Sequence, residues 1–86
     1  MHYTEDMKNR IKRIEGQARG ILRMMEEDKE CRDVVHQLSA VRSAVDRVIL
    51  YIVGTNMETC IREQLENGGD TEEVIKEAVQ LLVKSR

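Results

Sequence analysis

The segment from Cys31 to Cys60 restricts the possible folds more than any other part of the chain. It holds both cysteines of the 86-residue sequence, has helical apolar periodicity and contains no proline. If it forms one helix, its 29 steps of about 1.5 Å place the two thiols roughly 43 Å apart, whereas a disulfide needs Cα atoms about 4.4–6.8 Å apart. The two cysteines therefore do not pair within one straight helix. They can meet if two copies lie antiparallel, with Cys31 of one chain facing Cys60 of the other.

The apolar residues of this segment predict a helix that packs against more than one partner. A seam with alternating steps of three and four, as in coiled coils, consists of Leu38, Val41, Val45, Val48 and Ile52. Four more apolar side chains widen this seam beyond what one partner helix covers: Val34, Val35, Ile49 and Val53. The β-branched residues would also suit a strand, but the length and the period favour a helix.

A first helix is predicted to start at Thr4, whose hydroxyl can cap it, with Glu5 and Asp6 in the first turn, where the helix dipole favours negative charge. Its apolar stripe is made by Met7, Ile11, Ile14, Ala18, Ile21, Leu22 and Met25. A basic stripe flanks it, made by Lys8, Lys12, Arg19 and Arg23, while Arg10, Arg13 and Gln17 lie away from that basic stripe. Gly16 and Gly20 share one face, which indicates either close approach of another backbone or simple tolerance of glycine.

The rest of the chain completes an all-α prediction. The short polar link 26–30 should fold the second helix back, antiparallel to the first. Asn67-Gly68-Gly69 is expected to end the second helix with a left-handed cap. Asp70 is expected to cap a third helix, whose broad apolar face should dock on the bundle or on another subunit. A chain this short is expected to be one domain, 1–86, that gains stability by oligomerising.

Composition and charge limit the function. Aromatic residues make up 2% of the chain, which leaves little for a β-sandwich or for stacking on single-stranded nucleic acid. Residues 1–23 carry six basic and three acidic side chains, a net charge of +3, and the remaining residues carry eight basic and 13 acidic ones, a net of −5. A basic first helix on an acidic body could attract duplex DNA locally. The polar N-terminus and the lack of a long apolar run predict a cytosolic protein without a membrane segment.

The cysteines are the main candidates for chemistry. Cys31 starts a helix, where the dipole favours the reactive thiolate, although two small, buried and inert residues are an equal alternative. A soft metal held by two thiolates would need a third ligand one turn before Cys60, and Asn56 at that position is a poor one. His2 and His36 are expected to be surface residues. No catalytic motif is present, so we expect neither an enzyme nor a cofactor.

The residues 10–21, RIKRIEGQARGI, resemble the N-terminal signature of the CsoR/RcnR family of bacterial repressors. The resemblance extends over nearly the whole chain: a cysteine at the start of the second helix, the run 37–41 (QLSAV), the second cysteine, and the run 77–79 (EAV). It implies three helices per chain, an antiparallel four-helix-bundle dimer, a dimer of dimers, and operator DNA that is released when a sensor site is occupied. Family positions tied to DNA binding match Arg13, Gln17 and Arg47, with Lys8, Arg10 and Lys12 as lesser candidates.

The sensor position distinguishes branches of this family. Copper sensors resemble this chain at both cysteines but have a histidine four residues before the second one, where this chain has Asn56. The set Cys31, Asn56 and Cys60 is similar to that of the CstR branch, which senses persulfides. The resemblance therefore implies a homotetrameric repressor that responds to persulfide or polysulfide through Cys31 and Cys60, with no metal. The alternatives are a Cu(I) sensor, a helical adaptor with inert cysteines and, more remotely, a sulfurtransferase.

Overall fold

Residues 1–85 of the computed structural model are described, and they form three helices and no strand: α1 (Glu5–Glu26), α2 (Cys31–Glu66) and α3 (Glu72–Lys84). The predicted all-α class and the three helices are confirmed. The chain divides into two compact units, one comprising His2–Val48 and the other the part from Ile49 onward. In the part of the chain described, no helix is long and apolar enough to cross a membrane.

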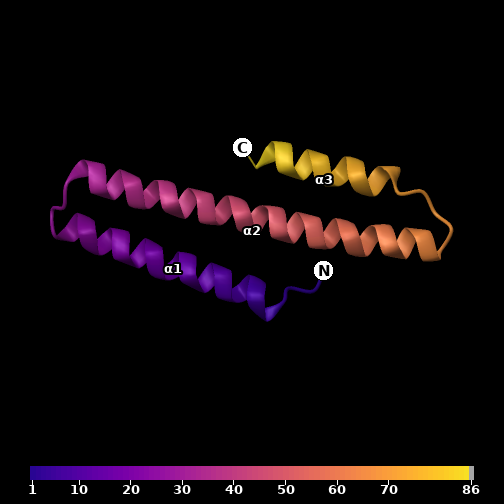
Figure 1. The fold of residues 1–86 in the computed structure, drawn as a ribbon, viewed down its shortest axis with the longest axis horizontal. Coiled ribbons are helices and arrows are strands. Elements are labelled where there is room, and N and C mark those ends of the chain that lie inside the picture. The colour runs from indigo at the N-terminus through magenta and orange to yellow at the C-terminus, as the bar shows by residue number, and fades with distance from the viewer. Residues whose placement is uncertain (86) are drawn as a thin grey trace. The chain divides into compact units, whose positions relative to one another are not determined.

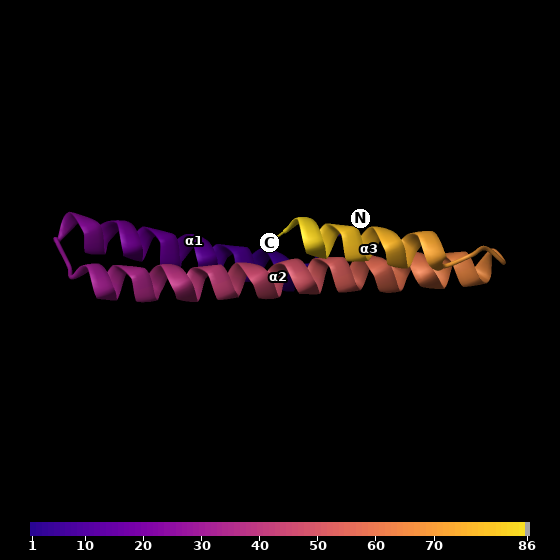
Figure 2. The ribbon, with the colours of Figure 1, turned by 90° about the horizontal axis from the view of Figure 1, so that it is seen from above.

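The first unit is a pair of antiparallel helices, α1 and the N-terminal half of α2 (Figures 1 and 2). As predicted, α1 begins after Thr4, whose Oγ1 accepts a hydrogen bond of 3.2 Å from the amide of Met7. Met7, Ile21 and Val48 are buried in this unit. The rest of the α1 stripe is only partly covered, because Ile11, Leu22 and Met25 are at least half exposed. One copy of the chain therefore leaves much of its apolar surface in water.

The second unit consists of the C-terminal half of α2 and α3, which lie antiparallel to each other (Figures 1 and 2). Ala78 is buried, and Val74 and Leu82, one turn before and after it, are half-buried, so this side of α3 faces α2. The expected docking of the third helix is thus observed. Its remaining large apolar side chains are exposed: Ile75, Val79, Leu81 and Val83.

Both long helices end in the same hydrogen-bonded motif. At the end of α2, the Gly69 amide donates to the Gln64 carbonyl (2.7 Å) and the Gly68 amide to that of Leu65 (3.3 Å), with Gly68 at φ 70°. This is the Schellman cap that the two glycines predict. At the end of α1, Lys29 and Asp28 make the equivalent bonds, and Asp28 takes the left-handed position at φ 55°. The α3 prediction shifts slightly: Asp70 does accept from an amide, that of Glu72 at 3.0 Å, but Thr71 directly precedes the helix.

Replacing Gly68 with alanine should destabilise the protein by about 1 kcal/mol, because a Cβ is disfavoured in the left-handed region. Gly54→Ala is the matched control: Gly54 lies within α2, and beyond the adjoining turns of that helix no atom of the described residues lies within 4 Å of the Cβ that would be added. That change should stabilise the helix by about 0.5–1 kcal/mol. Urea unfolding at one fixed protein concentration compares them, and equal effects of the two changes would contradict this account of the cap.

Candidate functional site

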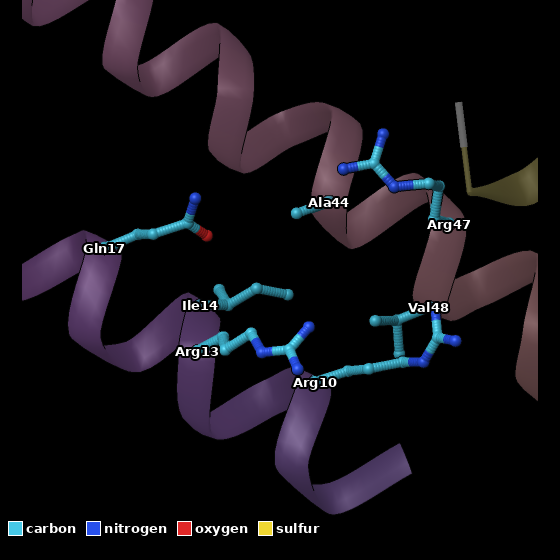
Figure 3. A pocket seen from close by; sticks show the side chains of 7 residues that line it. All are labelled: Arg10, Arg13, Ile14, Gln17, Ala44, Arg47 and Val48. Carbon is cyan, nitrogen blue, oxygen red and sulfur yellow. The ribbon is translucent and has the colours of Figure 1, made fainter. Parts of the chain in front are cut away.

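Arginine side chains surround a hollow between α1 and the N-terminal half of α2. The hollow has a volume of about 280 Å³ and is lined by Arg10, Arg13, Ile14, Gln17, Ala44, Arg47 and Val48 (Figure 3). Arg13 and Gln17 extend from α1 toward α2, and Arg47 comes from α2 beside Ala44 (Figure 3). We call this feature the arginine hollow. Its polar lining consists only of hydrogen-bond donors and one amide, with no carboxylate.

The arginines of the hollow differ in how they are paired. Arg10 is half-buried, and its Nε donates to Asp6 Oδ2 at 3.3 Å. Arg13 and Arg47 are exposed, and within the described residues neither forms a hydrogen bond or an ion pair with the protein. Two guanidinium groups thus stand beside one recess with their donors available to an external anion.

The structure separates the DNA-binding candidates into two groups. It brings Arg10, Arg13, Gln17 and Arg47 together around the hollow, although they are far apart in sequence. Lys8 and Lys12 do not line it. Lys8 instead lies 3.5 Å from Glu5, and on the same basic stripe Arg19 lies 4.0 Å from Glu15. Local carboxylates therefore partly neutralise Lys8 and Arg19 on the basic stripe, as Asp6 does Arg10 in the hollow, whereas Arg13 and Arg47 have no such partner among the described residues.

Gly16 and Gly20 are close to Arg13 and Gln17 on α1. Positions 13, 16, 17 and 20 recur at steps of three and four, so they share one side of the helix. Beyond the adjoining turns of α1, no atom of the described residues lies within 4 Å of the Cβ that would be added at either glycine. Within the described chain, the observed space agrees with simple tolerance of glycine and shows no close approach of a second backbone.

Cys31 is the first residue of α2 and is an exposed, free thiol. The carbonyl of the preceding Glu30 accepts from the amides of Asp33 (3.0 Å) and Val34 (3.1 Å), which closes the first turn of the helix. An electrophile in solution can reach this thiol without any movement of the chain.

Cys60 lies in the second unit and has one close polar neighbour. Its Sγ donates to Asn56 Oδ1 at 3.9 Å, and both side chains are half-buried. Asn56 is thus in contact with the thiol, at the position where a third metal ligand would stand. Among the described residues of one chain, no three side chains of His, Cys, Asp or Glu gather as a metal site. His2 and His36 are exposed, as expected.

The sequence did not identify the apolar lining of the hollow. Ile14 and Val48 were predicted as core residues and Ala44 was not singled out, yet all three line the recess together with the arginines. Ala44 is the informative position, because a small side chain three residues before Arg47 leaves room for a recess. Ala44 predicts a recess only when it is known that this turn of α2 faces α1.

Comparisons with known proteins agree with this architecture. The family model described as "Metal-sensitive transcriptional repressor" matches residues 3–84. The chain is 60% identical over 63 residues to the uncharacterized protein YrkD of Bacillus subtilis (73% of this chain, 100% of YrkD), and 38% identical over 80 residues to the copper-sensing transcriptional repressor CsoR of the same organism (93% and 78%). The solved structure of the nickel-responsive transcriptional regulator InrS superposes with a TM-score of 0.81 at 34% identity, covering 96% of this chain and 92% of InrS.

Members of this family are transcriptional repressors rather than enzymes, and CsoR and InrS are named for their responses to copper and nickel. The family model spans all three helices. On the strength of this match and of the shared fold, the chain belongs to the CsoR/RcnR family of metal-sensitive transcriptional repressors.

Proposed function

We propose that this repressor senses persulfide or polysulfide through Cys31 and Cys60, and that it binds operator DNA through the arginine hollow. The observation that carries the sensor proposal is the neighbour of Cys60: the amide oxygen of Asn56, 3.9 Å from Sγ. An amide is a poor ligand for a soft metal, whereas two thiols are sufficient for sulfur chemistry. The chain 1–86 would act as a single domain without a resident cofactor.

A second copy of the chain is needed to bring the two thiols together. Cys31 and Cys60 are 29 steps apart in α2, and on an ideal helix 29 steps return to within about 20° of the same side. Steps of seven and four connect the positions on that side: 31, 38, 45, 49, 56 and 60. Leu38 and Val45, between the cysteines, are 45% and 37% exposed. An antiparallel copy of α2 would cover these apolar side chains and place Cys31 opposite the partner's second thiol.

The proposed reaction starts at the more exposed cysteine. The Cys31 thiolate attacks the outer sulfur of a persulfide RSSH and breaks its S–S bond, so Cys31 becomes a persulfide and the thiolate RS⁻ leaves. The thiolate of Cys60 in the partner chain then attacks the Cys31 sulfur and expels hydrosulfide, which gives a disulfide. If both cysteines carry an extra sulfur, their condensation gives a trisulfide and releases H₂S. Either bridge would hold two α2 helices in one register, and it lowers operator affinity only if that register fits DNA less well.

Mass spectrometry tests this chemistry. After treatment with a polysulfide donor, peptides containing Cys31 and Cys60 should be joined between chains, with mass increases of whole sulfur atoms. Mixing isotopically light and heavy protein distinguishes links between chains from links within one chain. Treated protein in which the two peptides remain unlinked would refute the sulfur switch.

A Cu(I) sensor is the second candidate, since the similar CsoR is named as copper-sensing. Two sulfurs without an imidazole should hold Cu(I) weakly, so competition with a Cu(I) chelator separates the two proposals.

The adaptor alternative has no support from the family match. We further propose that the protein is a homotetramer, as the family resemblance implies, and that it acts in the cytosol, where a repressor meets its operator.

The DNA proposal predicts that Arg13→Ala weakens operator binding without unfolding the helices, because Arg13 is exposed and has no partner among residues 1–85. The logarithm of affinity should fall linearly with the logarithm of salt concentration, as phosphate contacts release counterions. Fluorescence anisotropy at several salt concentrations measures both effects. Arg19→Ala, on the basic stripe of the same helix, is the matched control. A larger loss for Arg19→Ala than for Arg13→Ala would place the DNA on the other side of α1.

A further inference from the structure

The shape and chemistry of the arginine hollow indicate which part of a duplex it can contact. Its rim carries the guanidinium groups of Arg10, Arg13 and Arg47, and no carboxylate lines it. Arginine presents a planar fork of donors that matches the oxygens of a phosphate group. Because Arg13 and Arg47 have no partner in the described chain, binding an anion there breaks no existing ion pair at either residue.

The concave shape of the hollow bears on whether it contacts the bases or the phosphates of DNA. The edges of bases lie at the floor of a groove about 8.5 Å deep, so a side chain must project outward to read them. The phosphates stand on the outside of the duplex and can enter a recess. Arg13 and Gln17 extend from α1 toward α2, and Val48, which is 5% exposed, is among the apolar side chains that line the hollow (Figure 3). A recess with donors on its rim fits a protruding phosphate better than a recessed base edge.

The surroundings of the hollow permit this approach. Gly16 and Gly20 share a side of α1 with Arg13 and Gln17, and neither has a side chain that would hold a neighbouring chain away. The large exposed apolar side chains of α1, such as Ile11 and Leu22, belong to the opposite side, which suits a second copy of the protein. The cationic side of α1 is thus left to an anionic partner.

We propose that the arginine hollow is a seat for one phosphate group, which the DNA backbone supplies in the operator complex. This face then positions the repressor on the duplex and contributes affinity, while discrimination between sequences comes from elsewhere. The inference rests on the proposed DNA-binding function and specifies the part of the DNA that the hollow contacts. Free phosphorylated molecules share the same chemistry and should compete for the seat.

The test compares two duplexes, the operator and a scrambled sequence of equal length, with the full-length protein and its Arg13→Ala and Arg47→Ala variants. Each variant should bind both duplexes about tenfold more weakly, as expected for loss of a charged hydrogen bond. The ratio of the two affinities should stay unchanged, and the salt slope should fall by about 1 for each hollow that engages the duplex. Replacing single operator phosphates with neutral methylphosphonates should identify one position per engaged hollow that weakens wild-type binding but not Arg13→Ala binding. Arg19→Ala is again the control.

A third experiment tests whether a free phosphate compound can occupy the hollow in place of a phosphate of the DNA backbone. Pyrophosphate, compared with sodium chloride at equal ionic strength, should weaken operator binding by the wild type more than by Arg13→Ala. If pyrophosphate lowers the operator affinity of both proteins equally, the hollow does not bind a phosphate. A methylphosphonate scan that finds no position dependent on Arg13 would contradict the proposal in the same way. If the variants lose the operator but keep the scrambled duplex, the arginines read bases: the inference fails while the DNA-binding function stands. If the wild type binds neither duplex, the proposed function itself fails.

Discussion

Replacing Asn56 with histidine is expected to turn a weak Cu(I) binder into a strong one. The imidazole would stand beside Cys60, where the Asn56 oxygen now lies 3.9 Å from Sγ, and would supply the third ligand of a trigonal site with the two thiolates. Loss of a hydrogen-bond partner behind a metal ligand already costs about 10–100-fold in affinity, so the gain of a ligand should exceed about 100-fold. Competition with a chromogenic Cu(I) chelator, carried out without oxygen, measures this change.

The control for this experiment is Asn56→Gln, which keeps the amide and adds no soft ligand. It should bind Cu(I) as weakly as the wild type. A double variant, Asn56→His with Cys31→Ser, should lose the gain, because the proposed site uses the thiol of the partner chain. If the wild type already binds Cu(I) as tightly as Asn56→His does, the copper-sensing alternative is favoured over sulfur sensing.

The second large effect is expected at Cys60. In the wild type, a polysulfide donor should reduce operator affinity by about 5–150-fold, the range of typical allosteric coupling. In Cys60→Ser the exposed Cys31 should still take up sulfur, but no bridge can form, so operator affinity should not change. Anisotropy with and without the donor measures the response, and mass spectrometry confirms that Cys31 has reacted.

Cys31→Ser provides the complementary variant. It should lose both the bridge and the first sulfur transfer, since the attacking thiol is absent. A full response in Cys60→Ser would show that modification of Cys31 alone releases DNA, and the bridge would then have no role. Both variants should bind the operator normally without donor, because neither cysteine lines the arginine hollow.

The arrangement of the thiols suits this order of events. Cys31 is exposed at the start of α2, while Cys60 is half-buried with its sulfur hydrogen-bonded to Asn56. In the proposed reaction, the accessible thiol meets the sulfur donor first, and the partly covered thiol resolves the adduct. The proposed bridge between two chains would act on the packing of α2, the helix that also provides Arg47 to the hollow. Sensor and proposed DNA contact thus share one structural element.

Local signals predicted the helices well because each of them acts within a few residues. The hydroxyl of Thr4 caps α1 through a bond to Met7 three residues on, and Gly68 permits the left-handed turn that ends α2. The length of α2 followed from apolar periodicity and the lack of proline between the cysteines. These features depend on backbone geometry and capping, which the neighbouring residues decide.

The site was only partly predictable. The family resemblance pointed to Arg13, Gln17 and Arg47, while the pattern of α1 alone gave equal weight to the basic stripe. The structure separates them, since Arg13 and Gln17 flank the side of α1 that packs on α2, and Arg19 on the stripe lies beside a carboxylate. The sequence did not predict the recess, because its wall belongs to residues about 30 positions away.

The sequence by itself determined the three helices, their ends, the distance between the two cysteines along α2 and the chemistry of Asn56 at the sensor position. Only the tertiary structure decided which cationic side chains lie together, and that apolar side chains line a recess among them. The physical reason is the range of the interactions. Helix formation depends on contacts within one or two turns, whereas the arginine hollow exists only where the side chains of α1 and α2 pack against each other.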